Sequence, residues 1–374
     1  MSPEQSDHPD APAEPANHPA PKRRLDLKKW ISDHKVWTGL IAAAIILIPA
    51  GVWAYLHYHH KPKSEPSAQS AEPAPVLQPA TVPDPLTGLE VTPQVAAQPV
   101  FGVVIENSPE ARPQSALSSA GVVYEALAEG GITRFLAVFQ DQQPASIGPV
   151  RSLRPYFIDW IQEYNNAPIA HAGGSAQALG EVGPLGVKSM NGLIYSANFQ
   201  RVSDRFAPHN LYTSTSSLLS LMQRLGYTTA PSFTSWAYKA DAAEATPSHP
   251  SITITYSYPL FTAKYSFDAN CDCYARALAG AAHIDRNTNQ QIKVKNVVAI
   301  TVQTSYDASG HALMTTVGSG KAVIFRDGGA VVGTWKKDAR TSRIKFLDAT
   351  GAEIQLDRGN TWISVVPQTG SVIY

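Results

Sequence analysis

A run of uncharged residues near the N-terminus, Val36–Leu56, constrains the possible fold and location of this chain more than any other part of its sequence. As a helix, the run is long enough to cross the roughly 30 Å of hydrocarbon in a bilayer. Trp37, Trp53 and Tyr55 lie near its ends, where amphipathic rings prefer the headgroup level. The run therefore predicts one transmembrane helix that places the chain in the lipid bilayer.

Basic residues predict the orientation of this helix. Lys61 and Lys63 follow the run closely, and a larger set precedes it: Lys22, Arg23, Arg24, Lys28, Lys29 and Lys35. Because positive charge is retained on the cytoplasmic side, we expect a single-pass cell-membrane protein with its N-terminus inside and its C-terminal domains extracytoplasmic. A cleaved signal peptide is the rival interpretation. The long N-terminal region and the bulky residues at the expected cleavage position argue against it.

Composition divides the rest of the chain. Residues 1–35 are polar and proline-rich, which predicts a disordered cytoplasmic tail, and residues 57–83 predict a Pro-rich stalk. We expect an N-terminal folded domain at 84–230, a connection at 231–250 and a C-terminal domain at 251–374. Lysine plus arginine equals aspartate plus glutamate, at 30 each, so charge offers no argument for a nucleic-acid partner.

The first folded region alternates apolar strand patterns with helical ones. Strands are predicted at Val100–Glu106, Gly121–Ala128, Ile132–Gln140 and Pro168–Ala172. One helix follows Ser152, a candidate N-cap, with Pro155 in its first turn. A second helix has Leu218, Leu219, Met222 and Leu225 on one face and ends at Gly226. This mixture predicts an α/β or α+β domain.

The second region contains short strands and turns, which predict a mainly antiparallel β domain, either a sandwich or a barrel. A weak helical pattern covers only Ala275–Ala282. Trp335 and Trp362 are interpreted as core residues rather than as a platform for sugars.

Cys271 and Cys273 are the two cysteines of the chain. Two such residues are too few for a disulfide framework, and both reduced thiols and a local disulfide remain open. No soft metal ligands accompany them, so no metal site and no cofactor are predicted.

Charged and hydrogen-bonding residues follow the predicted strands of the first region. They occur in Glu125–Arg134, Gly148–Arg154, His171–Ser175 and Arg205–Asn210, each beside glycine or proline. Strand ends and turns into helices are where ligands bind in sheets with helical crossovers, so we expect these segments to form one site. The predicted ligand-binding residues are Arg134, Arg151, Arg154, His171, Ser175, Arg205, His209 and Asn210.

Several motifs together resemble the YerB-like family of bacterial envelope proteins, whose members are mostly described as lipoproteins with a domain of unknown function. The matching segments are Ala111–Gln114, Val122–Glu125, Ile132–Arg134, Ile147–Ser152, His171 with Gly173–Ser175, Ala207–Asn210, Gly333–Lys337 and Gly359–Trp362. The resemblance covers most of residues 84–370. Many relatives have a lipid-anchoring cysteine where this chain has a predicted transmembrane helix. The resemblance implies no reaction.

Two functions remain open. In the first, the arginines hold an anionic group of a cell-wall glycan or an envelope protein partner. In the second, the chain is a hydrolase of peptidoglycan or a related polymer, with Glu125, His171 and His209 as candidate catalytic residues. A structural alternative also stands, in which the arginines pair internally with Glu125, Glu129 and Asp204.

Overall fold

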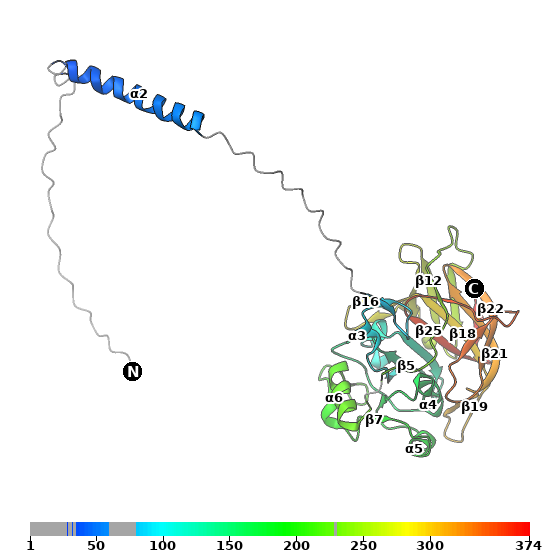
Figure 1. Cartoon of the computed structure of the whole chain (residues 1–374). Coiled ribbons are helices and arrows are strands. Elements are labelled where there is room, and N and C mark those ends of the chain that lie inside the picture. Colours follow the sequence, from blue (N-terminus) through cyan, green and yellow to red (C-terminus); the bar gives the residue numbers. More distant parts are fainter. Residues whose placement is uncertain (1–27, 29–31, 33–34, 60–79, 228–229) are drawn as a thin grey trace, which may run out of the picture. The chain divides into compact units, whose positions relative to one another are not determined.

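A computed structural model describes residues 28, 32, 35–59, 80–227 and 230–374 of the chain (Figure 1). The chain divides into two units, residues 1–77 and 78–374. Helix α2, Lys35–His59, belongs to the first unit and contains the predicted span, Val36–Leu56. It is the one helix of the described residues that is long and apolar enough to cross a membrane. Most of the predicted tail (1–35) and stalk (57–83) lies outside the described residues.

A ten-stranded sheet forms the centre of the second unit, with the order β23-β22-β21-β18-β25-β4-β5-β3-β6-β7. Its N-terminal strands are β3 (Phe101–Glu106), β4 (Val122–Leu127), β5 (Thr133–Phe139), β6 (Ile169–His171) and β7 (Ser189–Asn191). Its C-terminal strands are β18 (Asn296–Val302), β21 (Gly318–Arg326), β22 (Gly329–Lys337), β23 (Lys345–Leu347) and β25 (Thr361–Pro367). The predicted N-terminal strands are thus confirmed.

The two regions meet inside this sheet. Strand β25, red in Figure 1, pairs in parallel with β4 of the N-terminal region, with Thr361 opposite Val122 and Ser364 opposite Glu125. On its other side β25 pairs in parallel with β18. The fold class is confirmed as a mixed α/β region followed by a mainly antiparallel region. The sequence does not predict that the second region extends the sheet of the first.

A smaller, six-stranded sheet belongs to the C-terminal region and is antiparallel throughout. Its strands are β11 (Ser251–Thr255), β12 (Ala263–Asp268), β13 (Cys273–Leu278), β14 (Ala281–Ala282), β17 (Lys293–Val294) and β26 (Ser371–Ile373). The weak helical pattern over Ala275–Ala282 is therefore a wrong prediction. Alternation of buried and half-buried residues along β13 fits a strand with one face on the core.

Five two-stranded sheets complete the β structure of the described residues. They involve β1 (Val82–Pro83), β2 (Glu90–Val91), β8 (Gln200–Arg201), β9 (Leu211–Tyr212), β10 (Tyr238–Lys239), β15 (Ile284–Asp285), β16 (Gln290–Gln291), β19 (Thr304–Tyr306), β20 (Ala312–Met314) and β24 (Leu356–Asp357). The pairing of β10 with β24 matters below because it places Lys239 opposite Asp357.

Among the described residues of the second unit, four α-helices accompany the sheets: α3 (Pro93–Ala96), α4 (Pro155–Ile161), α5 (Ala176–Val182) and α6 (Thr215–Leu225). Helix α6 matches its prediction, since Ser214 caps its N-terminus and Gly226 ends it with a φ of 70°. The predicted cap of α4 is wrong. Arg154, not Ser152, is the N-cap, and its side chain makes no capping hydrogen bond. Pro155 stands in the first turn, as expected.

The core is continuous through both regions. Trp160 of α4 stacks on Tyr124 of β4, with ring centroids 5.1 Å apart. Trp362 of β25 is fully buried and Trp335 of β22 nearly so, which confirms both tryptophans as core residues. Burial of large aromatic rings stabilises the fold by roughly 2–3 kcal/mol each, so these residues hold the sheet and its helix together.

Candidate functional site

The four predicted segments are neighbours around residues 148–154. The amide of Val150 donates to the carbonyl of Leu211 over 2.6 Å, beside the Arg205–Asn210 loop. The amide of Ala172 donates to the carbonyl of Arg151 over 3.0 Å. The Arg134 guanidinium donates to the carbonyl of Ser152, also over 3.0 Å. Backbone pairing thus brings strand ends from distant parts of the chain to one edge of the sheet.

Glu106 organises the partly exposed members of this region. Its Oε1 lies 3.0 Å from Arg151 Nε and 3.0 Å from His209 Nδ1, and it accepts a hydrogen bond of 2.9 Å from the Ser108 hydroxyl. The Glu106 side chain is 4 % exposed, whereas those of Arg151 and His209 are 26 % and 23 % exposed. We call these four residues the Glu106 cluster. The buried carboxylate orients two cationic or hydrogen-bonding groups that remain open to solvent.

Glu129 holds the other two arginines. Its Oε1 accepts from Arg134 over 2.6 Å, and its Oε2 accepts from Arg154. Although burial opposes ionisation, the two guanidinium groups hold the pKa of Glu129 below its usual value. Arg134 and Arg154 are 3 % and 5 % exposed, so both are paired and covered. For these two residues the geometry matches the structural alternative.

Arg205, Asn210 and Ser175 also make internal contacts. The Arg205 guanidinium donates to the carbonyls of Ala111 and Pro113 over 2.6 and 2.7 Å. Asn210 accepts from Arg201 and donates to the carbonyls of its own loop. The Ser175 hydroxyl caps helix α5. Asp204 pairs with Arg286 instead of Arg205. These side chains shape the loops.

His171 is fully buried at the end of β6. Its Nδ1 lies 2.7 Å from the carbonyl of Gly173, and its Nε2 lies 2.8 Å from the Ser189 hydroxyl. Burial lowers the pKa of His171 to about 4, so the ring is neutral at pH 7. Both ring nitrogens are occupied, which leaves no free nitrogen for a substrate.

Glu125 is fully buried and faces the C-terminal region. Its Oε2 accepts from Arg276 over 2.6 Å, from the Tyr256 hydroxyl over 3.0 Å and from the Trp362 indole over 3.1 Å. Arg276 is equally buried, and its guanidinium lies over the Trp362 ring at 4.3 Å. A carboxylate this well satisfied links the two regions and is closed to a polymer substrate.

Sequence reasoning missed Glu106 and Arg276. Glu106 ends strand β3 and precedes Asn107-Ser108-Pro109, the same arrangement of strand end, polar residue and proline that identified the other segments. That signal was present in the sequence. Arg276 carries no comparable signal, because its partner is 151 residues away.

Residues 86–228 match the model of the N-terminal domain of DUF3048, a protein family of unknown function, and residues 252–363 match the model of its C-terminal domain. A protein of Bacillus subtilis described as "Putative lipoprotein YerB" is 31 % identical over 288 residues, covering 76 % of this chain and 86 % of the relative. The chain belongs to the DUF3048 family. This confirms the resemblance seen in the sequence.

The crystal structure of YerB from Bacillus subtilis supports the same assignment for this DUF3048 protein. It covers 78 % of this chain and 100 % of the YerB chain, with 29 % identity and a TM-score of 0.71. The relative is described as a lipoprotein, which agrees with a membrane-anchored envelope protein. Glu125 lies in the N-terminal DUF3048 domain and Arg276 in the C-terminal one, so the buried ion pair joins the two domains.

Proposed function

We propose that this DUF3048 protein is a membrane-anchored extracytoplasmic binding protein. In this proposal the Glu106 cluster holds an anionic group of a cell-wall glycan at Arg151 and His209. The observation that carries it is the shared contact of both side chains with one buried oxygen, Glu106 Oε1, at 3.0 Å each. A ligand would meet groups that are already oriented, which reduces the entropy lost on binding.

Open polar atoms of Arg151 and His209 support the proposal that the ligand is an anion. Among the described residues, the Nη atoms of Arg151 and the Nε2 of His209 have no hydrogen-bond partner. Phosphate and carboxylate oxygens match a guanidinium fork. His209 Nδ1 faces the Glu106 carboxylate and so carries its proton there, which leaves Nε2 as an acceptor in the neutral ring and as a second donor only in the protonated ring. Arg151 Nε lies 3.0 Å from Glu106 Oε1 in an ion pair without a hydrogen bond, so the carboxylate holds the guanidinium beside it by charge.

An exposed aromatic ring supports a glycan as the carrier of the anion. Phe206 is 90 % exposed on the loop that also contains His209. The ring of Phe206 offers a flat apolar face beside His209 on which a sugar ring can stack. An envelope protein partner is the competing occupant, and the experiment below separates the two.

The location follows from the anchor. Helix α2 is apolar, all of its described side chains except that of Ala54 are exposed, and basic residues precede it in the sequence. The description of the YerB relative as a lipoprotein supports a membrane location that is reached by another kind of anchor. We infer that α2 spans the cell membrane and that residues 78–374 lie outside it.

The hydrolase alternative has less support in the described residues. Two of its three candidate residues, Glu125 and His171, are fully buried and hydrogen-bonded. His209 alone is reachable, and a lone histidine without an oriented nucleophile does not form a hydrolytic site.

Sedimentation with purified peptidoglycan tests the proposal. The full chain in detergent is mixed with peptidoglycan that retains its phosphate-containing polymer, and with the same material after the polymer is removed. We expect binding to the first sample, and at least a tenfold loss for Arg151→Ala and His209→Ala. Arg358→Ala, which changes a surface arginine paired with Glu90, is the matched control and should bind as the wild type does.

Absence of wild-type binding to both samples would overturn the proposal, as would unchanged binding by Arg151→Ala. Equal binding to both samples, lost in Arg151→Ala, would reject the phosphate polymer and leave a carboxylate of the peptidoglycan itself. Capture of a purified envelope protein instead of either sample would assign the site to a protein partner and contradict the glycan proposal.

A further inference from the structure

Three aspartates from distant segments meet in the C-terminal region. Asp272 precedes β13, Asp327 occupies the turn between β21 and β22, and Asp357 ends β24. One carboxylate oxygen of each lies within 4.8 Å of one from each of the others. Their exposed fractions are 7 %, 8 % and 0 %. We call these three residues the Asp triad. Three buried like charges repel one another, so positive charge must be supplied to them.

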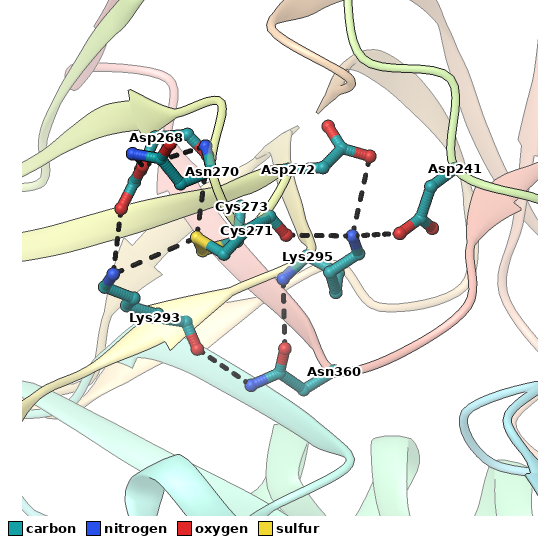
Figure 2. Close-up of a disulfide and its surroundings, with 9 residues drawn as sticks. All are labelled: Asp241, Asp268, Asn270, Cys271, Asp272, Cys273, Lys293, Lys295 and Asn360. Carbon is teal, nitrogen blue, oxygen red and sulfur yellow. Dashed lines mark hydrogen bonds and ion pairs between the residues drawn. A yellow bond between two sulfur atoms is a disulfide. The ribbon is translucent and has the colours of Figure 1, made fainter.

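Side-chain cations supply part of that charge. Lys239 Nζ lies 2.7 Å from Asp327 Oδ2 and 2.7 Å from Asp357 Oδ1. Arg326 pairs with Asp327 over 3.0 Å, and Lys295 reaches Asp272 over 3.5 Å. Lys295 also pairs with Asp241 at 2.6 Å, so its charge is shared between two carboxylates, as Figure 2 shows.

Two oxygens of the Asp triad have neither a hydrogen bond nor an ion pair among the described residues, whereas Asp357 Oδ1 has only its ion pair with Lys239. Asp357 Oδ2 and Asp272 Oδ1 are buried and have no hydrogen-bond partner among the described residues. A buried carboxylate oxygen without a donor is costly, and native structures rarely keep one without an ion or a water molecule. This observation is independent of the clustering itself, and it points to a ligand that carries positive charge.

We propose that the Asp triad is a binding site for a hard divalent cation of the Ca²⁺ type. All three protein ligands are carboxylate oxygens, with no nitrogen or sulfur among them, which is the set that hard cations select. Ca²⁺ suits the site better than Mg²⁺ because it accepts irregular geometry and longer bonds to oxygen. Lys239, whose side chain is 19 % exposed, leaves the Asp triad when the ion enters.

A disulfide holds one ligand of this site in place. Cys271 and Cys273 are bonded to each other and enclose only Asp272 (Figure 2). Asp272 has a φ of 46°, in the left-handed region that residues other than glycine seldom adopt. The covalent closure restricts the backbone on both sides of Asp272, so the oxidised chain presents its carboxylate already oriented. Reduction is therefore expected to weaken cation binding.

Terbium luminescence on the full chain in detergent provides the test. Tb³⁺ replaces Ca²⁺ at oxygen sites and emits when a nearby tyrosine is excited. The Tyr274 hydroxyl accepts from the Gly328 amide at 3.2 Å, one residue from Asp327, and so lies within range. We expect saturable emission that Ca²⁺ displaces at lower concentration than Mg²⁺. Tyr274→Phe should remove the emission and keep the rise in melting temperature caused by Ca²⁺.

Matched variants decide between a cation site and a permanent ion-pair network. Asp357→Asn should weaken Tb³⁺ binding at least tenfold, whereas Asp338→Asn, at an acidic residue whose side chain is 65 % exposed, should not change it. Lys239→Met should tighten binding at least threefold, because the competing cation is gone. The double variant Cys271→Ser/Cys273→Ser should weaken it.

Three outcomes would overturn the proposal. They are no saturable emission from the wild type, undiminished emission from Asp357→Asn, and weaker binding by Lys239→Met. The last outcome would identify Lys239 as an essential counterion of a purely structural network. Because Lys239→Met is expected to gain affinity, a folding defect in the aspartate variants cannot imitate the result.

Discussion

Arg276 Nη2 of β13 lies 2.6 Å from Glu125 Oε2 of β4, and neither side chain reaches solvent. The pair joins the two DUF3048 domains across 151 residues of sequence. Glu125→Gln is expected to lower the free energy of unfolding by about 3–5 kcal/mol, because Arg276 then remains as a buried, unpaired charge. Urea denaturation followed by tryptophan fluorescence measures the loss.

An exposed ion pair is the control for this prediction. Lys336 and Asp338 are 3.2 Å apart, and their side chains are 52 % and 65 % exposed. Lys336→Gln should change the free energy of unfolding by less than about 1 kcal/mol. Equal effects of Glu125→Gln and Lys336→Gln would contradict the view that the buried pair locks the domains.

Arg151 and Arg154 should differ in their effect on stability although they are three residues apart. Arg154→Met removes a covered guanidinium from Glu129 and is expected to cost roughly 1.5–3 kcal/mol. Arg151→Met changes a side chain that is 26 % exposed and should cost only about 0–1 kcal/mol. Thermal or urea unfolding of both variants measures the difference. A large loss in Arg151→Met would favour a structural role for the Glu106 cluster.

His171 predicts a pH dependence of stability. Its pKa in the folded chain is about 4, because burial disfavours the charged ring, whereas the usual value is 6.5. Between about pH 4 and pH 6.5, the unfolded chain therefore binds a proton at His171 that the folded chain does not bind. The contribution of His171 is complete above about pH 6.5 and is lost as the pH falls toward 4, by roughly 3 kcal/mol in all.

Comparison with His171→Gln isolates this contribution. The amide cannot titrate, so the stability of the variant should fall less steeply than that of the wild type between pH 6.5 and pH 4. His283 acts in the same direction, since burial lowers its pKa, and Asp357 acts in the opposite one, since burial raises its pKa to about 6. Both groups are unchanged in the variant, so parallel curves would reject the prediction for His171.

Residues 78–374 are expected to fold as a soluble fragment without detergent. They form a compact unit with its own core, and α2 lies outside it. Circular dichroism and gel filtration of the fragment measure folding and dispersion. Aggregation at every salt concentration and pH tried would contradict the chosen boundary.

The orientation of the anchor has a separate test. A reporter that is active only in the cytoplasm, fused after Tyr374, should be silent, because basic residues precede α2. The same reporter fused at the N-terminus should be active. The reverse pattern would place the DUF3048 domains inside the cell and remove the envelope glycan as a ligand.

Local chemistry made some of this structure readable from the sequence. The uncharged run at Val36–Leu56 defines an apolar helix, and the β-branched runs at Val100–Glu106 and Gly121–Ala128 contain β3 and β4. Gly226 ends α6 because it adopts positive φ without strain. In each case the deciding interaction lies within a few residues, so the sequence pattern contains it.

The candidate site was only partly predictable, because some of its deciding interactions are not local in the sequence. Arg151 and His209 were identified from loops that resemble ligand-binding turns, but their organiser, Glu106, was not. Helix α4 was located correctly, yet its N-cap was misassigned to Ser152, because Arg154 adopts the extended backbone of a cap without using its side chain. Among several adjacent polar residues, the one that becomes an N-cap or organises a site is selected by neighbours from other strands.

Tertiary structure alone decided the contacts between residues that are distant in the sequence. Strand β25 lies beside β4, Arg276 meets Glu125, and the Asp triad assembles from three distant segments. The sequence determined the anchor, the local elements and the chemical types of the side chains, because those follow from hydrophobicity, backbone preference and charge. Pairing of distant strands depends on which apolar faces pack together in three dimensions. No local pattern along the chain records that choice.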